Sequence, residues 1–462
     1  MSPLRTTQRR LKSIADGAAA RALDVRSTQS TLDTRTERPI TVAIVSLFSA
    51  PDVTGIAVYS TGLAQYLAST GARVRLHTTF GFYPAWEKAQ CDRGVLYRRG
   101  SADGLEIRRY YSYVPRRPTA LRRILHEASF AFGVALGYAF SSRADCTIVV
   151  VPPLPAALPV LLLARLKSSR TIVHVQDLQP DAAIDLGMLK PGVMTGVLFW
   201  LERLTYRLAD RVATISVGMQ DRIVRKGVPS ERTILFRNWA NDRAVKPMRH
   251  DTSYRHAWGL QDKFVVMYSG NMGVKQGLAS LLQAATLLAT EASVVFVVVG
   301  DGGEKEGLVA DAKRLGLTNV VFKPLQPYAR LSDLLATADV AVIPQLPGVT
   351  DIVLPSKLGN ILASARPVIV AAPIESELAR LVVEADCGLV VDPRDPKRMA
   401  DAVLDMVAAG AMNRARMGEN GRRFSSARLG EIATLSRFAQ TLRNLISSPI
   451  RSKRSVQSGR PD

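Results

Sequence analysis

The sequence is poor in the residues from which disulfide scaffolds and zinc sites are built. Its 462 residues include three cysteines, Cys91, Cys146 and Cys387, which lie far apart and form no CxxC pair or other spacing typical of metal ligands. This pattern predicts free thiols in a reducing compartment. Residues 1–37 contain no apolar stretch of the kind found in secretory signals, so we expect a cytoplasmic protein.

Several nucleotide-binding and nucleic-acid-binding signatures are also missing. No GxGxxG is followed by an acidic residue at the spacing of a dinucleotide site, and no GxxxxGK(S/T) loop occurs. No DxD pair follows an expected strand, so no metal site is predicted. RNA-binding, helix-turn-helix and zinc signatures are absent as well, so nucleic acid is not an expected partner.

Basic residues outnumber acidic ones by a wide margin. Lys and Arg total 61 against 40 Asp and Glu, a formal charge of +21, which favours an anionic partner. Residues 1–37 are predicted to be a disordered basic arm, and residues 447–462 a flexible basic tail. Each is either a solvated segment or one that holds anionic lipid. With 47% hydrophobic residues, the chain as a whole has ample apolar area for folded cores.

The longest apolar stretch, residues 147–164, is not expected to span a membrane. Pro152, Pro153, Pro155 and Pro159 interrupt it, and a proline inside a helix removes a backbone hydrogen bond. We expect a buried strand over residues 146–151, followed by a proline-rich loop and the start of a helix.

Strands and helices alternate along most of the chain. β-Branched runs such as residues 41–47 and 264–268 are each followed by a glycine-containing loop and an apolar helix. This order predicts an α/β protein with parallel sheets buried on both faces. We expect two Rossmann-like, doubly wound domains, residues 38–245 and 246–428, and a helix over residues 429–446 that packs back toward the first domain.

Three loops that follow expected strands are candidate anion sites, because backbone N–H groups and a helix N-terminus converge there. They cover residues 51–55, 269–273 and 300–303 and contain Gly55, Gly270 and Gly302. A glycine after a strand is as often present only to turn the chain, so no single loop is specific.

The ordered set of motifs is more specific than any one of them. The first half contains HVQDLQPDAAIDLGML (174–189) and LFRNWAND (235–242), and the second half contains YSGNMGVKQG (268–277), VVVGDGGEK (297–305) and LPSKLGNILASARPVIVA (354–371). In this order the chain resembles the retaining nucleotide-sugar glycosyltransferases of family 4, in the exopolysaccharide branch that includes the colanic-acid-biosynthesis enzymes. The resemblance implies the GT-B fold, with two facing Rossmann-like domains, the first for the acceptor and the second for the donor, and a cleft between them.

The resemblance also implies that basic side chains and a helix N-terminus, rather than a metal, stabilise the departing diphosphate. The family's lysine before its loop glycine is Gln276 here, so Lys275 and, more directly, Lys357 are the expected phosphate ligands; a solvated helix residue is the alternative for Lys357. The family's two glutamates fall on Ile352, beside Asp351, and on Asn360. The donor-site residues implied in this way are Gly55, Gly270, Asn271, Lys275, Gly302, Asp351, Pro355, Ser356, Lys357 and Asn360.

In the first half, the resemblance places candidate catalytic residues after the strand expected over residues 171–175. Gln176 and Asp177 occupy the place of the family's His-Asp pair, and His174 lies two residues earlier, where a core histidine is the alternative. Asp177, with Asp181 or Asp185, is expected to orient the acceptor hydroxyl. Lys357 is the third candidate catalytic residue.

A basic segment precedes an apolar one in the first domain. Residues 108–123 contain six arginines interleaved with aromatics, and residues 124–140 include Phe130, Phe132, Leu136, Tyr138 and Phe140. This combination is typical of an interfacial membrane anchor, and an ordinary loop with a core helix is the alternative.

Together these features predict a metal-independent, retaining hexosyltransferase that needs no cofactor. Its expected partners are a nucleotide-diphosphate sugar, a lipid-linked or saccharide acceptor and the anionic inner face of the cytoplasmic membrane, in exopolysaccharide or capsule biosynthesis. A nucleotide-sugar epimerase of the same fold and a non-catalytic binding protein of polysaccharide assembly are the alternatives.

Overall fold

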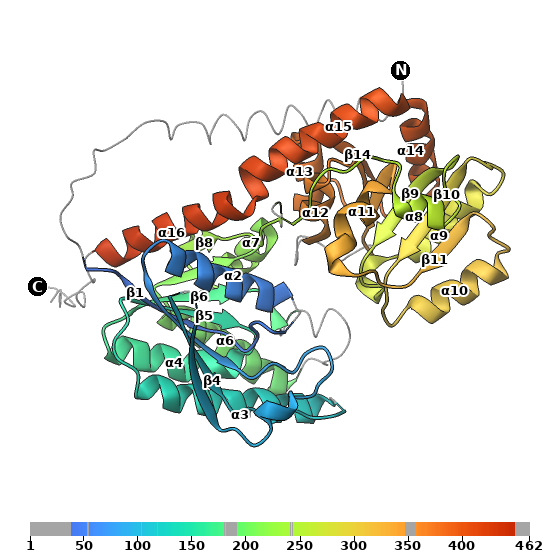
Figure 1. Ribbon diagram of the computed structural model, residues 1–462. Coiled ribbons are helices and arrows are strands. Elements are labelled where there is room, and N and C mark those ends of the chain that lie inside the picture. Colours follow the sequence, from blue (N-terminus) through green and yellow to red (C-terminus); the bar gives the residue numbers. More distant parts are fainter. Residues whose placement is uncertain are drawn as a thin grey trace, which may run out of the picture. The chain divides into compact units, whose positions relative to one another are not determined.

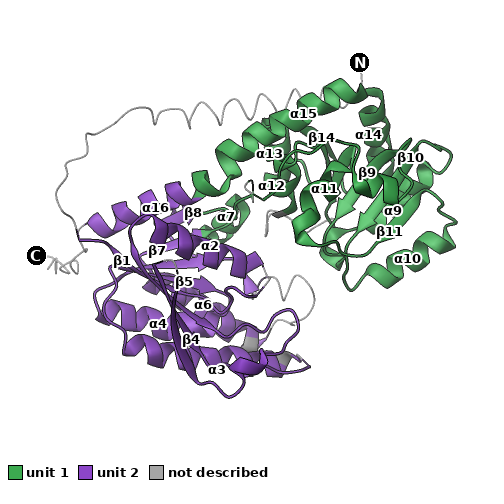
Figure 2. Ribbon diagram, viewed as in Figure 1, with its two compact units in different colours: residues 1–36, 214–225, 235–434 green, residues 37–213, 226–234, 435–462 purple. Residues whose placement is uncertain are grey.

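The computed structural model describes residues 38–448, apart from 53–54, 103, 118, 180, 182–191, 241, 243 and 347–355 (Figure 1). These residues form two compact units, which are described separately (Figure 2). Unit 1 contains the described residues of 214–225 and 235–434, and unit 2 contains those of 37–213, 226–234 and 435–462. The expected basic arm, and the basic tail beyond Ser448, lie outside the described residues.

Unit 2 is built around an eight-stranded sheet with the order β3-β4-β2-β1-β5-β6-β7-β8 in the part of the chain that is described. β1 pairs in parallel with β2 and β5, β2 with β4, and β5 with β6, whereas β3 is antiparallel to β4. The strands are β1 (Thr41–Val45), β2 (Arg73–Thr79), β3 (Tyr97–Ala102), β4 (Leu105–Tyr110), β5 (Cys146–Val151), β6 (Arg170–Val175), β7 (Arg211–Thr214) and β8 (Thr233–Leu235).

Helices cover both faces of this sheet. α3 (Ala120–Ala139) packs on α4 (Leu154–Leu166), and α4 packs on α6 (Val193–Leu208), so the three form a layer on one face. α2 (Gly55–Ser69) contacts β2 and β4 from the other face (Figure 1). With helices on both sides, β5 is buried along its whole length, which explains its unbroken run of apolar residues.

Unit 1 contains a six-stranded sheet with the order β11-β10-β9-β12-β13-β14 in its described residues, and each neighbouring pair is parallel. The strands are β9 (Phe264–Ser269), β10 (Val294–Val299), β11 (Val320–Lys323), β12 (Val340–Pro344), β13 (Val368–Ala371) and β14 (Gly388–Val391). The helices are α7 (Val217–Arg225), α8 (Ser253–Ala257), α9 (Ala279–Leu287), α10 (Lys305–Arg314), α11 (Leu331–Ala336), α12 (Ser356–Ala363), α13 (Glu377–Glu384), α14 (Pro396–Ala408) and α15 (Gly410–Phe424).

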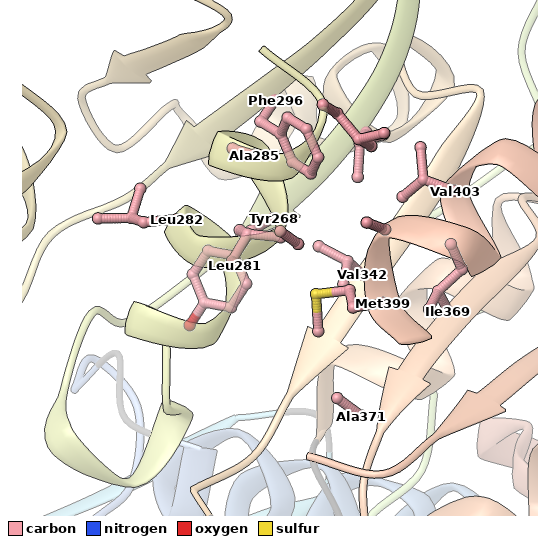
Figure 3. Packing of buried hydrophobic residues seen from close by; sticks show 14 of the residues in the cluster. Tyr268, Leu281, Leu282, Ala285, Phe296, Val342, Ile369, Ala371, Met399 and Val403 are labelled. Atoms are coloured by element: carbon pink, nitrogen blue, oxygen red, sulfur yellow. The ribbon is translucent and has the colours of Figure 1, made fainter. Parts of the chain in front are cut away.

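The largest core cluster of unit 1 lies between its sheet and the helices α9 and α14. Phe296 and Val342 from the sheet pack against Leu281 of α9 and Met399 of α14 (Figure 3). Tyr268, at the end of β9, belongs to this cluster through its ring, and its hydroxyl oxygen points out of it (Figure 3). The core therefore fixes the position of a polar group at the carboxyl end of a central strand.

The strand expected over residues 146–151 is confirmed, and those expected over 41–47 and 264–268 differ by one or two residues. The expected proline-rich loop after residue 151 is shorter than we predicted. α4 already begins at Leu154, with Pro155 in its first turn, where a missing N–H leaves no hydrogen bond unmade. Among the described residues, no helix combines the length and the apolar character needed to cross a bilayer.

The units differ from the predicted domains at the first boundary, because α7 joins unit 1. The N–H of Val217, at the start of α7, donates to the buried carboxylate of Glu377 on α13 at 2.7 Å, and the guanidinium of Arg237 donates to the same carboxylate at 2.6 and 2.9 Å. At the other boundary, α16 (Glu431–Ser447) belongs to unit 1 through Thr434 and to unit 2 from Leu435 onward.

Candidate active site

The strand order of unit 1 reverses direction between β9 and β12. Chain connections run outward from β9 to β10 and β11 on one side, and from β12 to β13 and β14 on the other. In parallel α/β sheets, ligands bind at the carboxyl ends of the two strands that flank such a reversal, because the loops there diverge to opposite faces. These ends are Ser269 and Pro344.

The loops that follow β9 and β10 are held together by backbone contacts. The N–H of Met272 donates to the carbonyl of Asp301 at 2.7 Å, and the N–H of Glu304 donates to the carbonyl of Met272 at 2.9 Å. A Cβ atom on Gly300 would lie 1.9 Å from the carbonyl oxygen of Gly270, and one on Gly302 would lie 2.3 Å from that of Met272. Only glycine allows the two backbones to approach this closely.

The loop after β12 also contacts the loop after β9. The N–H of Leu346, just after β12, donates to the carbonyl of Lys275 at 3.0 Å. Gly277 has a left-handed φ of +59°, and a Cβ there would lie 2.8 Å from the Leu346 nitrogen. The loops after β9, β10 and β12 therefore form one backbone assembly at the reversal point.

Lys357, in the first turn of α12, places its side chain on this assembly. Its ammonium nitrogen donates to the hydroxyl of Tyr268 and lies 4.1 Å from the centre of that ring. The hydroxyl of Tyr268 in turn donates to the carbonyl of Asn271. Gly270, at φ +140°, leaves room for the lysine stem, because a Cβ there would lie 2.3 Å from Lys357 Cε.

The ammonium of Lys357 is buried without a compensating negative charge among the described residues, where no carboxylate forms an ion pair with it. Burial lowers the pKa of Lys357 from 10.5 to about 7. Desolvation acts alone in lowering it, and it also raises the pKa of the neighbouring Tyr268 hydroxyl. A buried cation of this kind gains most from an anionic ligand that takes the place of the missing water.

The other predicted donor-side residues are placed as follows. Asn271 is exposed in the loop after β9, and Lys275 is half-buried in the 3₁₀ turn Val274–Gln276. Ser356 is the first residue of α12, and Asn360 lies one turn after Lys357 on the same helix. Asp351 and Pro355 lie outside the described residues.

Gly55, the remaining donor-side prediction, lies in unit 2 at the start of α2. A Cβ there would meet Tyr59 at an ordinary contact distance of 3.7 Å, so the local backbone does not require glycine. The nearby Asp52 holds two loops together at the carboxyl edge of the unit 2 sheet. Its carboxylate accepts 2.8 Å hydrogen bonds from the N–H groups of Phe82 and Tyr83, which ties the loop after β1 to the loop after β2.

The acceptor-side candidates of unit 2 lie in β6 or directly after it, and Asp185 lies outside the described residues. His174 is 3% exposed within the strand, and burial lowers its pKa to about 3, so the imidazole is neutral. Asp177 follows the carboxyl end of β6 and is partly exposed. The carboxylate of Asp181 forms an ion pair with the ammonium of Lys226, which also binds Glu202. The expected help of Asp181 to Asp177 stays a prediction.

Comparison with known proteins gives the family. A model of the glycosyl transferase 4-like domain matches residues 54–239, and a model of glycosyl transferases group 1 matches residues 251–424. WcaI of Escherichia coli, named as a colanic acid biosynthesis glycosyl transferase, is 35% identical over 351 residues, which are 74% of this chain and 85% of WcaI. The chain belongs to glycosyltransferase family 4.

Solved structures give the fold of this family 4 glycosyltransferase as GT-B. Sucrose-phosphate synthase from Thermosynechococcus elongatus superposes with a TM-score of 0.69 at 17% identity, over 89% of this chain and 100% of that one. HepE from Anabaena, solved with UDP and glucose, superposes with a TM-score of 0.63 at 15% identity, over 88% and 100% of the two chains.

Sequence reasoning on this glycosyltransferase missed Tyr268 as a functional residue, although it lies within a quoted motif. The feature of the sequence that could have indicated Tyr268 is its position after four apolar residues, near the end of the strand Phe264–Ser269. A tyrosine there can bury its ring in the core, but its hydroxyl needs a hydrogen-bond partner. The partner, Lys357, is 89 residues away in the sequence. No local pattern connects the two.

Replacement of Lys357 by methionine is expected to stabilise the ligand-free protein in a pH-dependent way. Lys357 titrates near 10.5 when unfolded and near 7 when folded, so between these values the unfolded chain holds the extra proton and stability rises with pH. Below about pH 7 the folded state carries the full cost of a buried ammonium. Lys357→Met should therefore add on the order of 1–3 kcal/mol near pH 6 and almost nothing near pH 10.

Urea unfolding at both pH values measures this gain. Lys313→Met, at an exposed position of α10, is the matched control and should change stability by less than about 0.5 kcal/mol at either pH. A gain for Lys357→Met that is the same at both pH values would contradict the assignment.

Gly300→Ala is expected to separate the loops after β9 and β10. The new Cβ would overlap the carbonyl of Gly270, and the residue would be held at φ +145°, so we expect a loss of about 2–4 kcal/mol in the free energy of unfolding. Gly303→Ala is the control, because a Cβ there meets no atom within 4 Å. Equal stability of the two variants would show that the close approach is not needed.

Proposed function

We propose that this family 4 protein is a retaining, metal-independent hexosyltransferase. It takes a sugar from a nucleotide-diphosphate sugar and transfers it to a lipid-linked or saccharide acceptor in exopolysaccharide or capsule biosynthesis. In this proposal the donor binds the carboxyl edge of the unit 1 sheet and the acceptor binds unit 2. Retention and the pathway are inferred from the family and from the similarity to WcaI.

The buried ammonium of Lys357 is the observation that carries the proposal. It lies at the strand-order reversal, on three loops whose backbones are held together, and no described carboxylate pairs with it. Negative charge grows on the diphosphate as the sugar leaves, and a cation already in position stabilises that charge without reorganisation. Burial away from water strengthens this interaction.

The choice of a nucleotide-sugar donor has support from a structural neighbour. HepE has been solved with UDP-glucose, at a TM-score of 0.61 and 15% identity to this chain. The likeness carries only the fold. We extend the ligand class to this protein because the same edge of its sheet offers Lys357, with Lys275 and Asn360 on the adjoining turn and helix.

Asp177 is the residue of unit 2 that we propose to contact the acceptor. It follows the carboxyl end of β6, and it is partly exposed. His174 has neither property, because it lies within the strand and is buried there. We assign no general base, since the departing phosphate oxygen can take the acceptor's proton.

Lys357→Ala is expected to lower turnover by roughly 10²–10³, as for the loss of one preorganised partner of a transition-state anion. Purified protein would be incubated with a panel of radiolabelled nucleotide sugars and candidate acceptors, and labelled acceptor and free nucleotide would be measured. Lys313→Ala serves as the comparison, because this lysine is exposed on α10 and belongs to none of the donor loops.

Three outcomes of this experiment would contradict part of the proposal. Unchanged kinetics for Lys357→Ala would remove Lys357 from the mechanism. Inversion of the donor sugar without transfer would indicate an epimerase. Binding of nucleotide sugars without turnover on any acceptor would indicate a non-catalytic protein of polysaccharide assembly.

We also propose that unit 2 contacts an anionic membrane through the outer side of α3. Phe130 and Tyr138 are buried, but Phe132 is 74% and Phe140 85% exposed, so the helix has apolar residues on both its inner and its outer side. The basic segment was predicted too broadly. Arg108 and Arg109 lie in β4, where Arg108 pairs with Glu106 and Arg109 donates to the carbonyl of Thr79.

The cations available to a membrane are therefore those that remain exposed near the start of α3. They are Arg116, Arg117, Arg122 and Arg123. Exposed arginines beside exposed phenylalanines suit the boundary between lipid headgroups and acyl chains.

The double variant Phe132→Ser and Phe140→Ser is expected to weaken binding to anionic vesicles by roughly tenfold or more, because each ring contributes buried apolar area. Cosedimentation with phosphatidylcholine vesicles, with and without phosphatidylglycerol, measures this. Met412→Ser, at an 87% exposed position of α15 in unit 1, is the control. Equal binding by the variant and the control would exclude α3 as the contact.

A further inference from the structure

Unit 2 contains a cavity of about 410 Å³ that belongs to neither proposed substrate site. Its lining residues come from the ends of α4, α6 and α16 and the starts of β6 and β7. Arg170 and Arg211 are the first residues of their strands, so the cavity lies at the amino edge of the sheet. Asp177 lies at the opposite, carboxyl edge of the same sheet.

The lining of the cavity is strongly basic. Its charged residues include two acids, Asp210 and Glu231, against five arginines. The five arginines are Arg165, Arg170, Arg207, Arg211 and Arg232. We call this set the arginine pocket.

One of the two acids is already engaged with the backbone. Asp210 Oδ2 accepts hydrogen bonds from the N–H of Thr171 at 2.8 Å and from its hydroxyl at 2.9 Å. Its other oxygen lies 3.8 Å from the guanidinium of Arg170. Glu231 is exposed and forms no ion pair in the part of the chain that is described. The positive charge of the pocket therefore exceeds what its own acids neutralise.

Two of the arginines have a structural role that fixes their position. Arg165 donates to the carbonyl of Leu208 at 2.8 Å, and Arg232 donates to the carbonyl of Tyr206 at 3.0 Å, both in the last turn of α6. These carbonyls have no partner within the helix, and they carry the negative end of its dipole. The two guanidiniums are thereby held at the wall of the pocket before any ligand arrives.

The remaining hydrogen-bond donors are largely unused. A guanidinium has five N–H groups, and Arg211 uses one on the carbonyl of Asp210 at 3.0 Å. Arg207 makes no side-chain hydrogen bond among the described residues. Burial lowers the pKa of Arg232; the charges of Arg211 and Arg165 lower it further, and those of Asp210 and Glu231 act in the opposite direction.

We propose that the arginine pocket binds a phosphate or diphosphate group. The fork of an arginine matches two oxygens of such a group, and several arginines together favour a multiply charged anion over a single carboxylate. The cavity volume of about 410 Å³ lies within the range of small-molecule binding sites. Binding removes the repulsion among the arginines.

The same chemistry has two sources, a free anion and the headgroup of a lipid. Leu162 and Leu166 on α4, which flank Arg165 in the sequence, are exposed, Leu166 to 82%. This apolar surface beside the pocket suits a lipid phosphate, whereas the pocket alone is sufficient for a soluble diphosphate. The experiment therefore uses one probe for each source.

The test variant is Arg207→Gln with Arg211→Gln, which removes two charges that cap no helix. The control is Arg203→Gln with Arg443→Gln, which removes the same charge from exposed positions of α6 and α16 outside the lining. Both pairs are made in a Lys357→Met background, which weakens diphosphate binding at the proposed donor site equally in the test and control proteins. Thermal unfolding of each protein verifies that it is folded.

Calorimetry with inorganic pyrophosphate, without divalent ions, probes the free anion. Cosedimentation with phosphatidylcholine vesicles, with and without phosphatidic acid, probes the lipid source. We expect the test variant to bind at least one of the two probes about tenfold more weakly than the control, with a difference that shrinks as salt is added.

Each outcome decides the matter. A loss with pyrophosphate supports a soluble anion, and a loss confined to vesicles with phosphatidic acid supports a lipid headgroup. Equal binding by test and control variants, or no binding of either probe to the control, overturns the proposal. The result is independent of sugar transfer, because neither substituted pair touches the donor loops.

Discussion

A lysine ammonium that is buried against a tyrosine, without a carboxylate beside it among the described residues, is the interaction on which the candidate site depends. Proteins rarely bury a cation in this way, because the loss of hydration is not repaid. Here the cost appears as the lowered pKa of Lys357. An anion at the same position would remove that cost, so the lowered pKa of Lys357 and the expected preference of the site for an anionic ligand have the same physical cause.

The loops around Lys357 can approach one another closely because three glycines in them have no Cβ atom. Gly270 makes room for the lysine stem, and Gly300 and Gly302 let the second loop lie on the first. The core beneath positions the same residues from the other side, since Tyr268 packs its ring among Leu281 and Phe296 and presents its hydroxyl to Lys357. The loops and the core therefore both fix the position of the Lys357 ammonium.

The order of strands and helices could be predicted from the sequence, because it depends on local patterns such as apolar runs of strand length. Lys357 was named as a phosphate ligand from the family resemblance, and that role stays a prediction. The sequence was not sufficient where a side chain meets a partner far along the chain. Asp181 was expected to act beside Asp177, and no local pattern indicates its ion pair with Lys226, 45 residues later. Arg108 and Arg109 were read as part of a membrane segment, but β4, a strand with no clear alternation, carries them into the sheet. Histidine 174 was correctly given a core alternative, because apolar residues flank it on both sides.

The edge strand of the unit 2 sheet, β3, affects whether the sheets of two molecules can pair. β3 pairs with β4 on one side, and β4 separates it from the parallel strands. An exposed edge strand has unpaired backbone groups with which a strand of another chain can form hydrogen bonds, and charged side chains on the edge strand oppose such pairing. β3 carries Arg98 and Arg99 in succession, which pair with Asp92 and Glu106. A second molecule that added a strand here would have to displace both ion pairs and accept a guanidinium on each face, so this margin resists sheet-to-sheet polymerisation.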